Sequence, residues 1–246
     1  MDPMTPSRRQ RRTDALSADA IVQAAITILD SRGEEALTFR ALADALETGP
    51  GAIYHHLPNK HEILTAAAAR LVSEATRKVA LHSDSAAGIR ELMLALFDLI
   101  DAHPWIGNQL AREPWQSALG EIFARIGEQL ERLGVAEEHL FVAASSLVNF
   151  VLGVAGQYAA AARFPSDADR TVLLRAIADD WRGDDRASLS FAHRMADRLA
   201  DHDERQQFAD GIEFLLVGIV SIAGRDSGPA AGLTSPQAPT SPALDE

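Results

Sequence analysis

The amino-acid sequence predicts an all-α fold. Apolar residues recur three and four positions apart through most of the chain, as in the face formed by Ile21, Ala25, Ile28 and Leu29. This spacing places them on one side of a helix. Ser, Thr or Asn precedes several such segments, and Gly or Pro interrupts them, as expected where helices begin and end. With 246 residues, 47% of them hydrophobic, the chain is long enough for two small helical domains or one large one.

The composition narrows the classes of protein to which the chain can belong. It has no cysteine, which excludes disulfides and thiolate metal sites. The first residues lack an apolar signal sequence, so we expect a cytoplasmic protein. The net charge of −12 is unevenly spread, with −1 on residues 1–60 and −11 on the rest. The first part can still bind nucleic acid, because a local basic surface is enough to attract phosphate.

Signals for helix ends divide residues 16–64 into four helices. The first is expected at residues 16–32, capped by Ser17 and stopped by Gly33. A short second helix follows Thr38, whose hydroxyl can accept a backbone N–H. Gly49 and Pro50 suit the N-cap and first position of an equally short third helix. Two short helices joined by a tight turn predict a helix-turn-helix unit.

The fourth helix begins at Lys60, after Asn59, which can cap it and receive a reciprocal capping-box bond from Glu62. A cation in the first turn of a helix opposes the helix dipole, so local stability does not explain Lys60. A phosphate bound at that helix N-terminus does explain it. Lys60 therefore indicates a nucleic-acid contact.

The third helix, about residues 50–56, has a surface suited to the DNA major groove. Gly51 and Ala52 are small and leave the backbone accessible. Tyr54, His55 and His56 follow with hydrogen-bond donors and no formal charge. A helix of this kind after a sharp turn can present its N-terminus to base edges. The alternative is a small helical hairpin with a solvated face.

Several motifs stand in order along this segment: Gly33, TFRALA at 38–43, PGAIYHHL at 50–57, Lys60 and EIL at 62–64. Through them residues 16–64 resemble the DNA-binding domain of the TetR family of transcriptional regulators. The chain departs from the family pattern at the turn, where Glu47-Thr48-Gly49 replaces the usual Gly-Val-Ser. Glu47 must therefore avoid or tolerate a positive φ.

The resemblance implies that double-stranded operator DNA is a partner. We expect Thr38, Tyr54 and Lys60 to contact phosphates, while Gly51, Ala52 and His55 lie nearest the bases. Arginines in residues 1–15, a segment with too little apolar surface to fold alone, form either a flexible arm in the minor groove or a solvated tail. The expected DNA-binding residues are Arg8, Arg9, Arg11, Arg12, Thr38, Arg40, Thr48, Pro50, Gly51, Ala52, Tyr54, His55 and Lys60.

Residues 140–162 contain no charged side chain. The segment is long enough to span a membrane, but polar residues dilute it and no basic cluster flanks it, so we reject that interpretation. A helix that is apolar all round is otherwise buried all round, which indicates that a second subunit covers part of it. Ser145, Asn149, Gly153 and Gly156 share one narrow side that permits close helix approach. We expect a homodimer formed by residues 140–162 and 204–223.

The remaining chain also reads as helices, at about residues 60–82, 86–102, 104–110, 114–133, 170–181 and 189–199. LIDAHPWIGNQ at 99–109, the helix after Gly134 and the closing apolar helix weakly resemble the regulatory domain of the branch related to tetracycline repressors. That resemblance implies a dimer built as a four-helix bundle and middle helices that enclose a pocket for a small-molecule inducer.

Polar residues near two proline-started helices and within the charge-free helix are the candidates for this pocket. Each amide among them has an alternative role in dimer contacts or backbone hydrogen bonds. The expected ligand-binding residues are His103, Trp105, Asn108, Gln109, Trp115, Asn149 and Gln157.

The sequence has no HExxH, GxSxG, phosphate-binding loop or dinucleotide motif, so we expect no enzyme, catalytic residue, cofactor or metal site. The predicted organisation is a flexible basic arm (1–15), a helix-turn-helix DNA-binding domain (16–64), a helical-bundle regulatory and dimerisation domain (65–224) and a disordered tail (225–246). The predicted function is a ligand-responsive transcriptional regulator, a repressor released from its operator by an inducer. The alternative, suggested by Glu47 in the turn, is a ligand-insensitive or non-DNA-binding relative that acts as an interaction module.

Overall fold

The structure is a computed structural model that describes residues 16–79, 84–112, 117–161, 167–183, 190–201 and 203–226. These residues form the eleven α-helices α2 to α12 and one turn of 3-10 helix, η1, and they contain no strand. The predicted all-α class is confirmed. The arginine arm, Trp115 and all but the first two residues of the predicted C-terminal tail lie outside the described residues.

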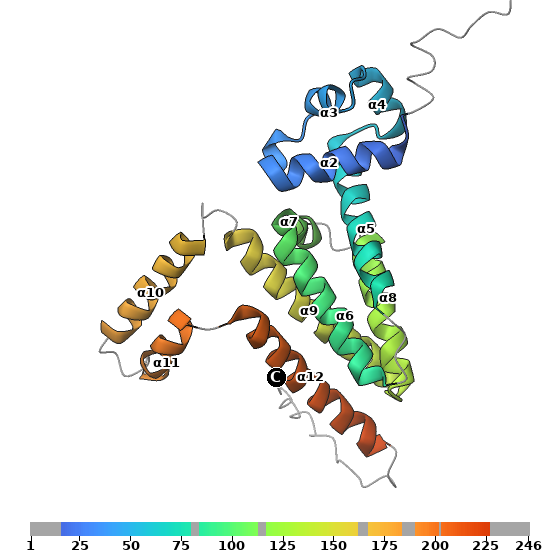
Figure 1. Cartoon of the computed structure of the whole chain (residues 1–246). Coiled ribbons are helices and arrows are strands. Elements are labelled where there is room, and N and C mark those ends of the chain that lie inside the picture. Colours follow the sequence, from blue (N-terminus) through green and yellow to red (C-terminus); the bar gives the residue numbers. More distant parts are fainter. Residues whose placement is uncertain are drawn as a thin grey trace, which may run out of the picture.

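A small N-terminal unit lies at one end of the molecule (Figure 1). It consists of α2 (Ala18–Arg32), η1 (Glu34–Ala36), α3 (Phe39–Ala45) and α4 (Pro50–His56). Ser17 caps α2 by accepting the N–H of Ala20 at 3.1 Å, and Gly33 ends α2 with a φ of 76°. Ile21, Leu42 and Ile53 are fully buried and join the three α-helices in one core.

Helix α5 (Lys60–Lys78) leads from this unit into a larger bundle (Figure 1). Asn59 caps it by accepting the N–H of Glu62 at 2.8 Å. The expected return bond differs in its partner, because the Glu62 carboxylate accepts from the Asn59 side-chain amide at 3.0 Å rather than from its backbone. The helix is continuous across the predicted domain boundary after residue 64, so a change at one end can reach the other.

The larger bundle contains α6 (Ser85–Ala102), α7 (Pro104–Arg112), α8 (Ser117–Arg132), α9 (Glu137–Ala161) and α12 (Glu204–Asp226). Helix α5 packs on α6 and α8, and α7 packs on α9. Helix α12 is held by Phe208, whose ring stacks against Phe97 of α6 and Phe150 of α9, with centroids 5.0 and 4.8 Å away. It ends at Asp226 and so includes the first two residues of the predicted tail.

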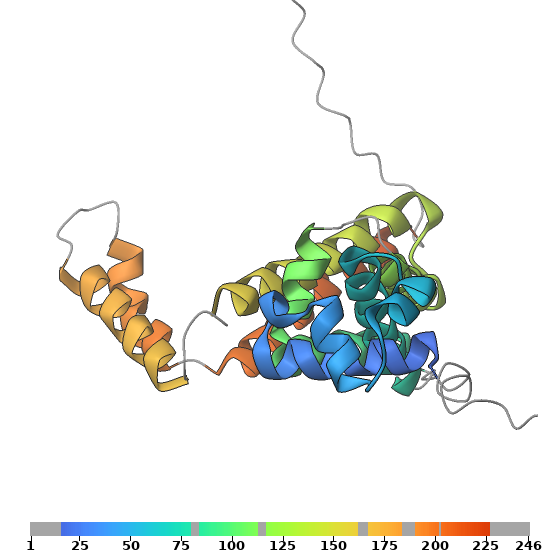
Figure 2. The same cartoon turned by 90° about the horizontal axis from the view of Figure 1, so that it is seen from above.

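The two remaining helices, α10 (Asp167–Gly183) and α11 (Ser190–Asp201), pair with each other as a hairpin. Figures 1 and 2 show this hairpin standing apart from the bundle, beyond the end of α9 and the beginning of α12.

Candidate nucleic-acid interface

The beginning of α3 presents two of the predicted DNA-binding side chains. Thr38 accepts the N–H of Ala41 at 3.0 Å, so its hydroxyl caps the helix as the sequence predicted. Thr38 and Arg40 are both exposed. A hydroxyl that is fixed by a cap and still faces solvent can also donate to an acceptor outside the protein.

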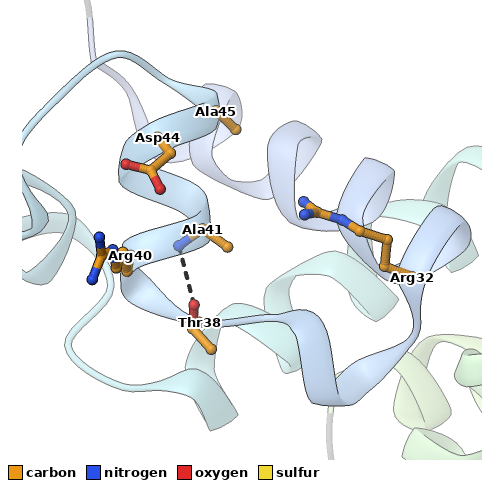
Figure 3. Close-up of a pocket in the computed structure, with 6 residues that line it drawn as sticks. All are labelled: Arg32, Thr38, Arg40, Ala41, Asp44 and Ala45. Atoms are coloured by element: carbon orange, nitrogen blue, oxygen red, sulfur yellow. Dashed lines mark hydrogen bonds between the residues drawn. The ribbon is translucent and has the colours of Figure 1, made fainter.

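A shallow hollow of about 350 Å³ lies between the end of α2 and α3 (Figure 3). Two arginines line it, Arg40 from α3 and Arg32 from the last turn of α2, together with Thr38 and the carboxylate of Asp44. Arg32 is absent from the residues predicted from the sequence. Its position immediately before Gly33 marks it as the end of a helix, but only the fold brings it towards α3. Guanidinium and hydroxyl groups are suited to phosphate oxygens.

The turn after α3 settles the question raised by Glu47. Its φ is 50°, in the left-handed region, and Glu47 is the only non-glycine residue with a positive φ in the described part of the chain. The N–H of Thr48 donates to the carbonyl of Ala43 at 2.9 Å, and the N–H of Glu47 donates to that of Asp44 at 3.3 Å. These two bonds form a Schellman motif with Glu47 at the position where glycine is usual. The turn therefore has its usual hydrogen bonds despite the unusual residue.

The recognition helix α4 is anchored on one side and exposed on the other. Gly49 and Pro50 occupy its N-cap and first position, as predicted. Ile53, in the middle of the helix, is fully buried on its inner side. The ring of Tyr54 stacks on Phe39 of α3, with centroids 3.8 Å apart and planes within 6°. Pro50, Gly51, Tyr54 and the two histidines are exposed, whereas Ala52 and Thr48 are half-buried. Tyr54 is thereby held by packing while half of its surface remains accessible.

Lys60 has a structural partner that the sequence did not reveal. Its ammonium donates to the carbonyl oxygen of Glu34 at 2.6 Å, which accounts for the cation in the first turn of α5. The Glu34 carboxylate in turn pairs with Arg112 at the end of α7, with its two oxygens 3.1 and 3.0 Å from Nη1. Lys60 therefore lies at a junction between the N-terminal unit and the larger bundle.

A second pair of contacts at this junction involves two predicted ligand-binding residues. The indole N–H of Trp105 donates to Oδ1 of Asp30 at 2.7 Å, and Nδ1 of His103 lies 2.7 Å from the same oxygen. Asp30 belongs to the last turn of α2, whereas His103 and Trp105 stand at the beginning of α7. These side chains are thus joined to the DNA-binding unit.

The other predicted ligand residues are divided between two places. Gln109 is buried and Asn108 half-buried on α7, while Asn149 and Gln157 are exposed on α9. The two α9 amides share the outer side of α9 with Gly153 and Gly156, the side on which the sequence predicts close approach of another helix. The structure does not bring these four residues together with His103 and Trp105 around one cavity.

The outer sides of α9 and α12 form a second candidate surface. Phe214 is 80% exposed and Phe141 70% exposed, and Val142, Val217, Val220 and Ile222 are also exposed. By length and composition alone, the segments Glu137–Gln157 and Glu204–Ala223 could each cross a membrane. Exposed apolar area of this size marks an interaction surface.

Comparisons with known proteins agree with this geometry. Residues 21–71 match the model of bacterial regulatory proteins of the tetR family. A transcriptional regulator from Streptomyces coelicolor, the TetR protein SCO7222, is 41% identical to the chain, with a TM-score of 0.74 over 85% of this chain and 99% of that one. An HTH-type transcriptional regulator of Saccharopolyspora erythraea is 26% identical over 89% of this chain and 91% of its own length. The TetR family protein ActR of Streptomyces coelicolor, in a structure with actinorhodin, shares the fold at 24% identity, with a TM-score of 0.70 over 85% and 99% of the two chains.

A helix-turn-helix unit joined by a continuous helix to an all-α bundle is the architecture of these relatives, which are transcriptional regulators. The chain belongs to the TetR family of transcriptional regulators. The family resemblance inferred from the motifs at residues 33–64 is confirmed.

Proposed function

We propose that the chain is a cytoplasmic, homodimeric repressor that binds operator DNA and is released by a small-molecule inducer. The observation that carries the DNA-binding part is the construction of α4. Ile53 anchors the helix in the core and Tyr54 is stacked on Phe39, so its exposed N-terminal side is presented rigidly to a groove. Repression is what the resemblance to the family implies, since its members are most often repressors.

The DNA contacts divide by chemistry. Thr38, Arg40 and Tyr54 bind phosphates and fix the register, and Arg32 joins them through the hollow beside Arg40. Lys60 also binds a phosphate, with the N–H donors that its bond to the Glu34 carbonyl leaves available. Gly51, Ala52 and His55 lie nearest the bases, where small side chains permit close approach. Thr48 and Pro50 border the same groove, and the arm with Arg8, Arg9, Arg11 and Arg12 reaches the minor groove.

The outer sides of α9 and α12 supply the dimer contact. A Cβ added at Gly153, Gly156 or Gly218 would meet no atom within 4 Å, so these positions are open in the protomer and available for close helix approach by a partner. Pairing about a twofold axis covers the exposed phenylalanines and valines of both copies. It also places two recognition helices on one face of DNA, roughly 34–36 Å apart or somewhat more, over a near-palindromic operator.

Inducer release requires that a ligand favour a conformation in which the recognition helices no longer match the operator. Helix α7 is the element best placed to respond. On one side it touches α9 so closely that a Cβ at Gly107 would lie 2.3 Å from the carbonyl oxygen of Ala155. On the other side it holds Asp30 and Glu34 of the DNA-binding unit. Movement of α7 therefore changes both contacts.

The inducer is a medium-sized, largely apolar molecule with hydrogen-bonding groups. Asn108 and Gln109 on α7 are the polar residues that contact it. His103 and Trp105 transmit its effect to Asp30, while Trp115, Asn149 and Gln157 complete the proposed ligand set. The complex of ActR with actinorhodin supports a small molecule as the ligand class, because ActR has the same fold.

The test is a mobility-shift titration with the DNA upstream of the chain's own gene. Lys60→Ala is expected to weaken binding and to reduce the salt slope by about 1, the signature of one lost phosphate contact. Tyr54→Phe keeps the stack on Phe39 and removes only the hydroxyl, so it should weaken binding without lowering the melting temperature. Unchanged affinity and salt slope in both variants would show that the interface lies elsewhere, and no binding by the wild type would favour the interaction-module alternative.

A compound screen for release of the same DNA then tests the inducer. Asn108→Leu and Gln109→Leu should weaken the response to an active compound by about fivefold to 150-fold, because a binding site that loses a buried hydrogen bond loses about 1–3 kcal/mol. The response of the Asn149→Leu variant to the same compound shows separately whether α9 contributes to the ligand site. An inducer whose affinity is the same in all three variants would place the pocket elsewhere.

A further inference from the structure

The recognition helix α4 contains no lysine or arginine. Its sequence is PGAIYHH, in which only His55 and His56 can become positively charged. Proteins gain most of their sequence-independent affinity for DNA from cations placed against phosphates. The charge that this helix offers to DNA is therefore set by the protonation of two imidazoles.

The rest of the DNA-binding unit is short of fixed cations. Residues 16–64 have three Lys/Arg and seven Asp/Glu, a net charge of −4 with neutral histidines. One of the three cations, Lys60, already donates to the carbonyl oxygen of Glu34. Three of the eight histidines in the sequence lie within residues 55–61. Protonation of these histidines would change the net charge of the unit from −4 to −1.

Both imidazoles of α4 are available to an external acceptor. They are exposed, and within the described chain neither has a hydrogen-bond or ion-pair partner. Their rings meet edge to face, with centroids 5.7 Å apart. They stand in the last turn of the helix, where the helix dipole favours a cation. Figure 1 shows α4 at the end of the molecule remote from the larger bundle. Each ring can therefore meet a phosphate without losing a contact inside the protein.

The ionisable groups around α4 do not neutralise the imidazoles. On the neighbouring elements these groups are Asp19, Asp30 and Arg32 of α2, Arg40 and Asp44 of α3, Glu47 of the turn, and Lys60, His61 and Glu62 at the beginning of α5. Asp30 is held by His103 and Trp105 of α7, and Glu62 accepts from Asn59. Asp44 and Glu47 are exposed just before α4 and repel phosphates. A cation on α4 offsets that repulsion.

We propose that protonation of His55 and His56 adds phosphate contacts to the recognition helix, so that operator affinity rises as the pH falls below neutrality. This inference rests on the proposed binding of operator DNA by α4 and adds a control by pH. Histidine is the side chain whose charge ordinarily changes between pH 5 and 8. A neighbouring phosphate favours the charged form of an imidazole. Binding of DNA then takes up protons, and by reciprocity protons strengthen the binding of DNA.

The first test is a mobility-shift titration with the DNA upstream of the chain's own gene, at about pH 6 and about pH 8 and at several salt concentrations. The wild type is expected to bind at least about tenfold more tightly at the lower pH, because hydrogen bonds to charged groups are stronger than neutral ones. The slope of log affinity against log salt should steepen by about 0.9 for each imidazolium that meets a phosphate.

Three variants identify the groups that titrate. The double variant His55→Gln and His56→Gln keeps hydrogen-bond donors and removes the titration, so its affinities at the two pH values should be nearly equal. The double variant His55→Lys and His56→Lys fixes the positive charge, so it should keep the steep salt slope at both pH values. His193→Gln, at an exposed histidine of α11, is the matched control and should retain the pH dependence of the wild type.

Circular dichroism at both pH values shows whether each variant is folded. A wild type that binds DNA equally at the two pH values, with one salt slope, would overturn the proton dependence and leave operator binding by α4 intact. A pH dependence that persists in the double glutamine variant would also overturn it, because another group would then bind the proton. A wild type that binds no DNA at either pH would overturn the proposed function itself.

Discussion

The N-terminal unit and the α9–α12 region differ in how much of their functional surface one protomer completes. In the N-terminal unit Ser17 and Thr38 cap α2 and α3, Pro50 begins α4, and the exposed residues of α4 are mostly polar. In the α9–α12 region, phenylalanines and valines remain exposed, and a hairpin stands apart from the bundle. The first surface is complete within one protomer and is suited to a charged, hydrated ligand, whereas the second is apolar and is the proposed dimer contact. The difference suggests that one protomer carries the DNA-reading surface but not the assembly that positions it.

The largest expected effect comes from blocking the dimer without damaging the protomer. Gly153→Leu should produce a folded monomer, because a Cβ at Gly153 meets no atom within 4 Å in the protomer. A monomer engages one half-site, so operator affinity should fall about 100-fold or more through lost avidity. Sedimentation and mobility-shift titration measure the two consequences.

Gly120→Leu on α8 is the matched control, since it is also an exposed helical glycine with open space around it. It should remain dimeric and bind DNA normally. If the Gly153→Leu variant formed dimers as tightly as the wild type does, the interface would lie on another surface.

The contrast between the two regions also explains what the sequence could predict. Caps at Ser17, Thr38 and Asn59 depend on residues within three positions of one another, so local patterns located them correctly. The bond between Asp30 and Trp105 joins residues 75 positions apart, and no local pattern announces it. The same limit applies to Lys60, whose partner Glu34 is 26 positions away.

For the regulatory part, the helices were predicted more accurately than their surfaces. Residues 140–162 lie almost entirely within α9 (Glu137–Ala161), so the prediction of a long apolar helix there was correct. The amides Asn149 and Gln157 were predicted to bind a ligand, with dimer contacts as an alternative role, because composition alone does not tell which side of an uncharged helix faces its own protomer. The packing of α6, α7 and α8 on α9 decides that, and it leaves both amides outside.

An intermediate effect is expected at the junction between the two regions. Asp30→Ala leaves the mostly buried indole N–H of Trp105 without its acceptor, which should lower the free energy of unfolding by about 1–3 kcal/mol. Asp30→Asn retains an acceptor oxygen and should cost less. Chemical denaturation measures both, and hydrogen exchange in α2 and α7 shows whether the loss is local. Equal stability of the alanine variant and the wild type would show that the junction does not hold the two regions together.

A smaller effect, of opposite sign, is expected in the turn of the N-terminal unit. Glu47 adopts a φ of 50°, which costs an ordinary residue free energy that glycine avoids. Glu47→Gly should therefore raise the free energy of unfolding by about 0.5–1 kcal/mol. Glu47→Ala is the control, because it removes the charge and keeps the backbone strain. If both variants bound DNA more tightly, the Glu47 charge would be the cause of that change. If only the Glu47→Gly variant were more stable, the gain in stability would come from the backbone.

The smallest effect concerns one of the two ion pairs between α12 and α6, the pair of Arg90 with Glu213. Arg90 Nε lies 2.5 Å from Glu213, and the hydrogen bond from Arg90 lowers the pKa of the Glu213 carboxyl from its ordinary value of 4.5. A lowered folded-state pKa contributes stability that is present above the unfolded value and lost as the pH falls through the folded one. Both side chains are nearly half exposed, so solvent screening limits the contribution to a few tenths of a kcal/mol.

Glu213→Gln should therefore be slightly less stable than the wild type at pH 7, and the two should converge as the pH is lowered below 4.5. Denaturation at several pH values measures the difference, and a gap that widens in acid would mean that the carboxylate is not stabilised by Arg90. Because α12 is fastened to its own protomer mainly by the Phe97, Phe150 and Phe208 cluster, its outer side should stay available to a second copy in this variant.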